Sequence, residues 1–295
     1  MNLHKKYKRH KYIGLLYIAP WIIGFLIFQL YALSSSGYYS FTAYNLFEAP
    51  TWVGLKNYIK IFTNDHEFYQ SLKVTILYVL GTVPPKIIFA LFIAVVLNMN
   101  VKGIKIFRTI YYLPSILGGG VALSVIWRYL FEISGSINQM LAFIGIEGPN
   151  WLGDPKFALF TIGILPVWQY GSSMVLFLAA LIQIPKEMYE SADVEGASRM
   201  RKFFAITLPF ISPILLFNII MQTINAFQNF TAAFVVTAGG PLKATYLYSI
   251  MLYHNAFEFL KMGYASAQSW LLFIMLMLLS LVIFKTSSRY TFYND

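Results

Sequence analysis

The stretch "YESADVEGASRMRKFFAITLPFISP" occupies residues 189–213 and separates two long apolar runs of the chain. Its acidic side chains come first, a glycine follows, and the basic side chains come last. Pro185 suits the first turn of a helix, and acidic residues near the positive end of that helix stabilise it. Gly196 is expected to end this helix, Ser198 to cap a second short helix, and Pro209 to end that second helix. The stretch therefore predicts a helix-turn-helix inside an otherwise apolar chain.

The composition of the whole chain places it in a membrane. Of its 295 residues, 58% are hydrophobic and only 12% are charged, which excludes a soluble globular protein. A hydrocarbon layer about 30 Å thick is spanned by roughly 20 apolar residues in a helix. Suitable runs lie at residues 13–34, 74–97, 109–131, 158–182, 210–235 and 264–284. We predict an all-α integral membrane protein with six transmembrane helices.

The basic residues are distributed unevenly among the loops. The formal net charge is +10, and 14 of the 22 lysines and arginines fall on one side if the six runs alternate across the membrane. Loops rich in these residues face the cytoplasm, so both termini and the stretch 189–213 are expected there. Membrane topology explains the charge, and we predict no nucleic-acid partner. The first run is longer than the apolar region of a signal peptide, so it is expected to remain as a span.

No repeat, low-complexity tract or flexible linker divides the chain, which predicts a single transmembrane domain over residues 1–295. Within it we expect an N-terminal span with an outer segment at 1–69, a core bundle at 70–285, and the cytoplasmic loop at 185–209. Prolines and glycines recur inside the runs, and such breaks survive in a membrane where protein or water satisfies the freed backbone groups. Kinked helices are therefore expected, in a moving transporter or in an ordinary bundle.

Motifs of enzymes are missing from the sequence. It contains no glycine-rich phosphate loop, no dinucleotide-binding fingerprint, no H-E-x-x-H motif and no cysteine. We predict no catalytic residue, no metal site and no cofactor bound by this chain, so that any ATP would be hydrolysed by another chain. Lys86 is the clearest charge inside a run. An intramembrane cation is a functional candidate, but its long stem is expected to snorkel to the interface.

The fifth run carries a stripe of amide side chains. Asn218, Gln222, Asn225 and Asn229 follow steps of 4, 3 and 4, which places them along one helical face, and Gln228 lies beside the outer end. Facing lipid, unpaired amides would cost several kcal/mol each, so the stripe is expected to face protein or water. Two interpretations stay open: amides that pair between helices, or the polar lining of a solute pathway.

Aromatic and polar residues near the stripe extend the pathway hypothesis. Phe227 begins a row with Phe230 and Phe234 at helical spacing, and such rings suit the faces of sugars. The stretch "PVWQYGSSM" in the fourth run combines tryptophan, glutamine and serine next to a kink, although a tryptophan there could also anchor an interface. The predicted substrate pathway consists of Trp168, Gln169, Tyr170, Ser173, Asn218, Gln222, Asn225, Phe227, Gln228 and Asn229.

The stretch 189–213 resembles the EAA loop of the permease subunits of bacterial ABC importers. That pattern is E-A-A, three residues, G, nine residues, then I-x-L-P. This sequence keeps every spacing and departs only in a serine for the middle alanine. The resemblance implies that the loop couples the permease to an ATPase through Glu190, Ser191, Ala192, Asp193, Glu195, Gly196, Ala197, Ile206, Leu208 and Pro209.

Other stretches resemble the carbohydrate-uptake branch of these importers, which includes the maltose and glycerol-phosphate permeases. Among them are "FRTIYYLPSILGGGVALSVIWRYLF" at 107–131 and "LAALIQIPKEMYESA" at 178–192. The resemblance implies the permease subunit of an ATP-driven, binding-protein-dependent importer that moves a sugar, by preference an oligosaccharide, across a bacterial cytoplasmic membrane by alternating access. The alternative solute is glycerol-phosphate or a polyol. The amide stripe contains no lysine or arginine, which argues against a phosphorylated solute.

The same resemblance implies a set of partners. They are a second related permease subunit in a heterodimer, two copies of a cytoplasmic ATPase that hold ATP and Mg, an extracytoplasmic solute-binding protein, and membrane lipid. Two other function classes compete with this one. A membrane-embedded enzyme would need a histidine or acidic cluster at membrane depth, which the runs lack. A secondary carrier or channel would transport its solute without any ATPase.

Overall fold

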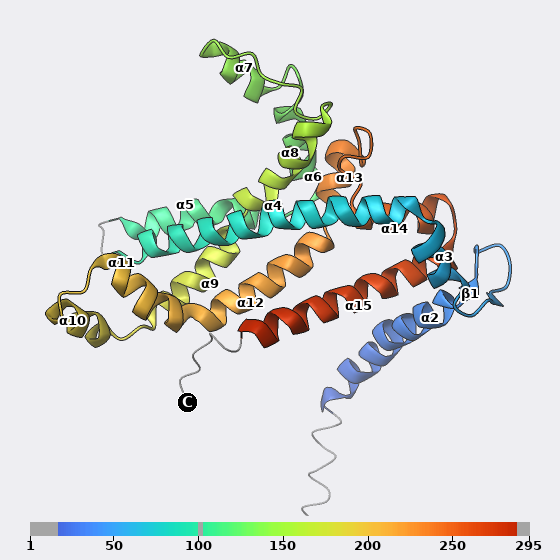
Figure 1. Cartoon of the computed structure of the whole chain (residues 1–295), viewed down its shortest axis with the longest axis horizontal. Coiled ribbons are helices and arrows are strands. Elements are labelled where there is room, and N and C mark those ends of the chain that lie inside the picture. Colours follow the sequence, from blue (N-terminus) through green and yellow to red (C-terminus); the bar gives the residue numbers. More distant parts are fainter. Residues whose placement is uncertain (1–16, 100–102, 288–295) are drawn as a thin grey trace, which may run out of the picture. The chain divides into compact units, whose positions relative to one another are not determined.

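The computed structural model describes residues 17–99 and 103–287, and helices dominate it (Figure 1). The expected all-α class is confirmed: within the described part, the strands β1 (Thr42–Ala43) and β2 (Thr51–Trp52) are two residues each and pair antiparallel. The basic N-terminal residues, the start of the first predicted span, Lys102 and Arg289 lie outside the described residues. The predicted cytoplasmic position of both termini therefore stays a prediction.

The predicted apolar runs coincide with helices. Among the described residues, the helices long and apolar enough to cross a membrane are Tyr17–Ser40, His66–Leu97, Arg199–Phe227 and Met262–Thr286. Bent helix pairs cover the other two runs, namely Ile104–Ile116 with Val121–Leu130 and Pro155–Trp168 with Gly171–Ile182. The described part therefore has four candidate spans, or up to six if each bent pair is one span. The number six stays a prediction.

The described chain forms two compact units. The first contains residues 17–65 and 252–273, with η1 (Phe25–Leu30), α2 (Tyr31–Ser40), β1, β2, α3 (Lys56–Asn64), η3 (His254–Glu258) and the first part of α15 (Met262–Ser287). Asn57 of α3 donates hydrogen bonds of 2.9 Å to the carbonyls of Ser40 and Thr42, and Tyr264 of α15 donates one of 2.5 Å to Asp65. Side-chain hydrogen bonds thus join the helices of this unit.

The second unit contains residues 66–251 and 274–287, and α4 (His66–Leu97) lies at its centre. Three helices pack against α4, namely α8 (Pro155–Trp168), α9 (Gly171–Ile182) and α12 (Leu208–Phe227). Tyr78, Ile162 and Phe177 fill the space between these helices and are fully buried or nearly so. The unit also holds α7 (Ser136–Phe143), α13 (Thr231–Thr237) and the first four residues of α14 (Tyr248–Tyr253). All of the candidate site residues belong to this unit.

The third predicted run, 109–131, is not one continuous helix. It divides into α5 (Ile104–Ile116) and α6 (Val121–Leu130), which meet at 99°. Three consecutive glycines separate the two helices, and Gly118 has a φ of +68°. Each glycine disfavours a helix by about 1 kcal/mol relative to alanine, and a left-handed residue ends it. The expected kink is thus a full break.

The fifth run also ends earlier than predicted. The sequence predicts one helix over 210–235, but α12 stops at Phe227 and α13 begins at Thr231. Tertiary contacts at the break replace helical hydrogen bonds, because Ser249 donates one of 2.5 Å to the backbone carbonyl of Asn229. α13 then packs against α6. A helical spacing that runs across residues 227–231 therefore does not place its residues on one face.

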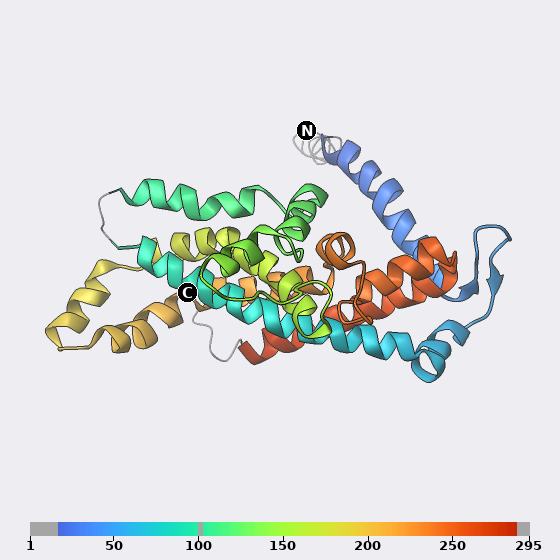
Figure 2. The same cartoon turned by 90° about the horizontal axis from the view of Figure 1, so that it is seen from above.

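The predicted helix-turn-helix is present, with one correction. α10 (Lys186–Val194) and α11 (Arg199–Lys202) form a hairpin beyond the ends of α4 and α12 (Figures 1 and 2). Pro209 does not end the second helix, because α11 continues through the π-helical turn η2 (Phe203–Thr207) into α12. The Leu208 N–H bonds to the carbonyl of Phe203, five residues back, and this wider turn accommodates a proline that lacks its own N–H.

Candidate functional site

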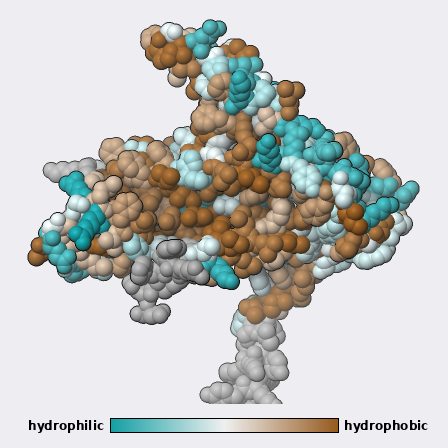
Figure 3. Space-filling view, in the orientation of Figure 1, coloured by the Kyte–Doolittle hydropathy of each residue, from teal (hydrophilic) through white to brown (hydrophobic). Residues whose placement is uncertain are grey.

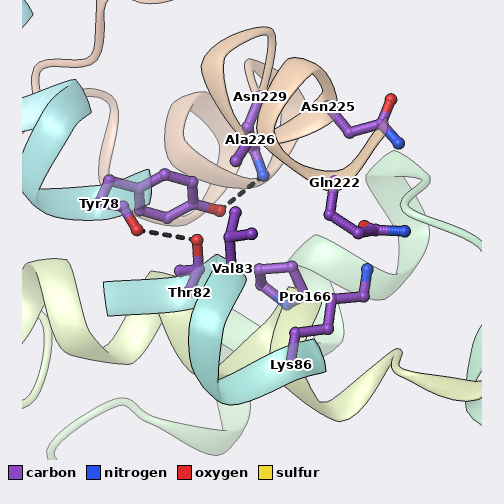
Figure 4. A pocket seen from close by; sticks show the side chains of 9 residues that line it. All are labelled: Tyr78, Thr82, Val83, Lys86, Pro166, Gln222, Asn225, Ala226 and Asn229. Atoms are coloured by element: carbon purple, nitrogen blue, oxygen red, sulfur yellow. Dashed lines mark hydrogen bonds between the residues drawn. The ribbon is translucent and has the colours of Figure 1, made fainter. Parts of the chain in front are cut away.

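A pocket of about 90 Å³ lies between α4, α8 and α12 (Figure 4). Its polar lining combines three amides with three side chains of α4. The amides are Gln222 and Asn225 of α12 and Asn229 just after its end, and the side chains of α4 are Tyr78, Thr82 and Lys86. In Figure 4 the heads of Gln222, Asn225 and Lys86 extend toward the same side, away from the ring of Tyr78. The pocket is thus polar although it lies among apolar helices.

Hydrogen bonds between helices hold two of these amides. Asn229 donates to the hydroxyl of Tyr78 over 2.7 Å, and Gln222 donates to the hydroxyl of Ser173 on α9 over 3.1 Å. Thr82 donates back to the Tyr78 carbonyl over 2.8 Å, which satisfies its hydroxyl within α4. The two interpretations of the stripe are therefore compatible, because the same amides join helices and line a pocket.

The other two members of the stripe have different surroundings. Asn225 is exposed, and in Figure 4 its amide extends away from the ring of Tyr78. Asn218 is 1% exposed and donates over 3.0 Å to the carbonyl of Ile214 in its own helix. Asn218 does not line the pocket, so three of the four amides in the predicted stripe line it.

A second pocket of about 220 Å³ adjoins the first and shares Pro166 and Asn229 with it. Gln169 and Gln228 line it, and Gln169 donates a hydrogen bond of 2.6 Å to the carbonyl of Gly118. Both glutamines lie directly after the C-terminal residue of a helix, at the ends of α8 and α12. The breaks in these helices thus bring two predicted pathway residues to one place.

The predicted aromatic lining is only partly present, because Phe230 of the predicted row lines the second pocket and the other predicted rings do not. Trp168 packs near Trp127 with ring centroids 6.0 Å apart, and Tyr170 meets Phe89 edge to face at 4.7 Å. Phe227 is buried, and none of these three predicted residues lines either pocket. The row of Phe227, Phe230 and Phe234 requires an unbroken helix, and α12 ends at Phe227 before α13 begins at Thr231.

Sequence reasoning missed the contribution of α4. Tyr78, Thr82 and Lys86 follow two steps of four, which places them along one face of α4. That spacing was the signal available in the sequence. Lys86 was expected to snorkel to the interface, but the structure places it in the pocket lining beside the amides of α12.

The turn of the helix-turn-helix has the geometry that its glycine predicts. Gly196 has a φ of +73°, in the left-handed region that favours glycine. The Ala197 N–H bonds to the Ala192 carbonyl over 2.9 Å, and the Gly196 N–H bonds to the Asp193 carbonyl over 3.0 Å. This is the Schellman pattern of a helix C-terminus, so the glycine of the motif determines the turn.

Side-chain contacts connect the two arms of this hairpin. The hydroxyl of Ser198 accepts a hydrogen bond of 3.3 Å from the Arg201 N–H and caps α11. Lys202 pairs with Asp193 over 2.5 Å, and the hydroxyls of Tyr189 and Thr207 lie 2.8 Å apart. The hairpin is thus linked to the first turns of the long helix that contains α12.

The outer surface of the hairpin is exposed and chemically mixed. Hydrophilic residues gather on it, whereas hydrophobic residues cover most of the adjoining helices (Figure 3). The predicted coupling residues Glu190, Ser191, Asp193, Glu195 and Gly196 are exposed, whereas Ala192, Ala197, Ile206, Leu208 and Pro209 are half-buried. Apolar side chains are exposed beside them, with Val194 at 91% and Met200 at 68%. Such a surface is typical of a protein-binding site.

The chain is similar to known proteins over most of its length. Residues 61–286 match the family described as "Binding-protein-dependent transport system inner membrane component". The chain is 47% identical to the probable ABC transporter permease protein YesP of Bacillus subtilis, over 100% of this chain and 96% of that one. It is 33% identical to the trehalose/maltose transport system permease protein MalF of Thermococcus litoralis, over 96% and 97%.

A solved structure is similar over nearly the whole chain. It is a bacterial ABC transporter involved in the import of the acidic polysaccharide alginate, and it matches with a TM-score of 0.80 at 24% identity. The match covers 98% of this chain and 100% of that one. At this identity the similarity establishes the fold alone.

Proposed function

The chain belongs to the family of binding-protein-dependent transport system inner membrane components, and we propose that it forms part of the sugar pathway of a bacterial ATP-driven importer. The predicted family is thereby confirmed. A relative named for trehalose and maltose transport supports a sugar as the solute, and we propose an oligosaccharide as the class of sugar. The glycerol-phosphate alternative has no comparable support among these relatives.

The observation that carries the proposal is the polar pocket between α4, α8 and α12. Sugars present hydroxyl groups that donate and accept hydrogen bonds, and amide side chains do both. Asn225 is exposed at the pocket, so its amide is free to meet a solute, whereas Gln222 and Asn229 are held in position by other helices. A preformed polar lining lowers the cost of ordering when a solute binds.

The hairpin provides a mechanical connection to the pocket. The helix from Arg199 to Phe227 is continuous over 29 residues, so a displacement at its start is carried about 40 Å to the pocket lining at Asn225. An ATPase that binds the hairpin differently in its open and closed states would favour one pore conformation over the other, because a ligand shifts an equilibrium only by its differential affinity. Alternating access of the pocket would follow.

The proposed assembly includes chains other than this one. A second permease would complete the pore, two ATPase subunits would bind ATP and Mg and contact the hairpins, and an extracytoplasmic binding protein would deliver the sugar. The exposed apolar residues Val194 and Met200 suit the ATPase contact, since burial in an interface would remove them from water.

Single cysteines test the pathway, because the natural chain has none. We expect Asn225→Cys in the reconstituted complex to react with a charged, membrane-impermeant thiol reagent, and the reaction to stop ATP-dependent sugar uptake. Phe217→Cys is the control, since Phe217 is also exposed on α12 but lies outside the pocket. Full uptake after modification at residue 225 would remove the pocket from the pathway. Uptake by the purified chain without an ATPase would support a secondary carrier.

A further inference from the structure

Lys86 is a cation without a protein partner in the described chain. Across residues 17–99 and 103–287, no hydrogen bond or ion pair connects its ammonium to another residue. Its side chain is half-buried and lines the pocket that contains Gln222 and Asn225 (Figure 4). No acidic side chain lines this pocket. The structure thus places one uncompensated positive charge among amides.

The position of Lys86 along α4 argues against snorkelling along its own helix. It lies eleven residues before Leu97, the C-terminal residue of α4, and twenty residues after His66. At about 1.5 Å per residue, the nearer end is about 16 Å away, much farther than a stem of four methylenes extends. An ionised group at membrane depth is costly unless it meets water or an opposite charge. The polar pocket has room for water beside the ammonium, and an anionic solute would supply the opposite charge.

We propose that Lys86 is the docking point for a carboxylate on the transported sugar, so that the importer takes oligosaccharides that contain uronic acid units. This inference rests on the proposed sugar pathway and deepens it. The ammonium of Lys86 would bind the carboxylate, while the amides of Gln222 and Asn225 would bind hydroxyl groups of the same sugar unit. The pair would be formed only while the solute occupies the pocket.

The pocket suits a carboxylate better than a more highly charged anion. Its volume of about 90 Å³ is large enough to admit a small polar group such as a carboxylate. Phosphate recognition commonly relies on arginine forks or on several backbone N–H groups. This lining has one lysine, no arginine and no glycine. The amide stripe itself contains no cation, but Lys86 of α4 adds a positive charge to the same pocket.

The test compares acidic and neutral solutes in the complete reconstituted importer. The probes are short uronate oligosaccharides and, for each, the neutral hexose oligosaccharide of the same linkage and length. We expect the wild-type complex to import acidic members of the panel, and Lys86→Gln to lower their uptake by about tenfold or more, since one charge-assisted hydrogen bond is lost. Neutral uptake, where it occurs, should change by less than about twofold. Lys73→Gln is the matched control, because Lys73 is exposed on the same helix outside the pocket.

A second variant separates charge from folding. Lys86→Cys should behave as Lys86→Gln does, and an aminoethyl thiosulfonate that restores a positive charge should recover acidic uptake. A sulfonatoethyl thiosulfonate, which adds a negative charge, should not recover it.

Acidic uptake that is unchanged in Lys86→Gln, or a wild-type complex that imports only neutral sugars, would overturn the inference and leave the sugar pathway intact. Equal losses for both solutes together with loss of the second permease on purification would instead assign Lys86 to an ion pair between subunits. If the wild-type complex imported no sugar in the presence of ATP, the proposed sugar pathway would be refuted as well.

Discussion

Replacement of Gly196 by alanine tests whether backbone conformation or surface shape makes this glycine necessary. Gly196 has a φ of +73°, and a Cβ placed there would meet nothing within 4 Å. The cost of alanine is therefore only that of the left-handed conformation, about 1–2 kcal/mol for a residue with a Cβ. The Schellman hydrogen bonds from Gly196 to Asp193 and from Ala197 to Ala192 depend on that conformation. Alanine should therefore loosen the turn and leave the membrane helices in place.

Hydrogen exchange and transport measured on the same complex check this expectation. A cost of 1–2 kcal/mol corresponds to an increase of about 5- to 30-fold in the equilibrium constant for opening of the turn. It should be measured as faster hydrogen exchange of the backbone amides in residues 186–202. Sugar uptake per ATP hydrolysed should fall in parallel. Gly196→Asn is the matched control, because asparagine tolerates the left-handed region better than other side chains. Asparagine should recover most of the protection and uptake. If both variants lost uptake equally and exchange did not change, a docked ATPase would exclude any side chain at this position, and the conformational argument would be wrong.

Two other substitutions test the contacts described above. Tyr78→Phe removes the acceptor of the Asn229 hydrogen bond and should destabilise the complex by about 1–3 kcal/mol, measured as a lower thermal midpoint in nanodiscs; an unchanged midpoint would show that water replaces the hydroxyl at no cost. Glu190→Lys reverses an exposed charge that has no ion pair within the described residues, so we expect normal membrane insertion but loss of uptake and weaker co-purification of the ATPase; undiminished co-purification would count against the docking role of the hairpin.

Local sequence patterns predicted the features that depend on residues close together in the chain. The turn at Gly196 follows from hydrogen bonds between residues no more than five positions apart, so a glycine at the right distance from a capped helix was sufficient to predict it. The apolar runs likewise predicted helices, because a backbone in lipid must satisfy its own polar groups. The coupling role of the hairpin and the number of spans stay predictions.

What surrounds each side chain was decided by the tertiary structure. Tyr78 and Asn229 are 151 residues apart and share a hydrogen bond, and Lys86 lies beside Gln222 only because α4 packs against α12. The break after Phe227 likewise depends on a bond from Ser249, twenty residues away, which a helical repeat does not contain. Periodicity within one segment determines which residues share a face. It does not determine where the segment ends when distant groups compete for its backbone, or which helix its polar face will meet.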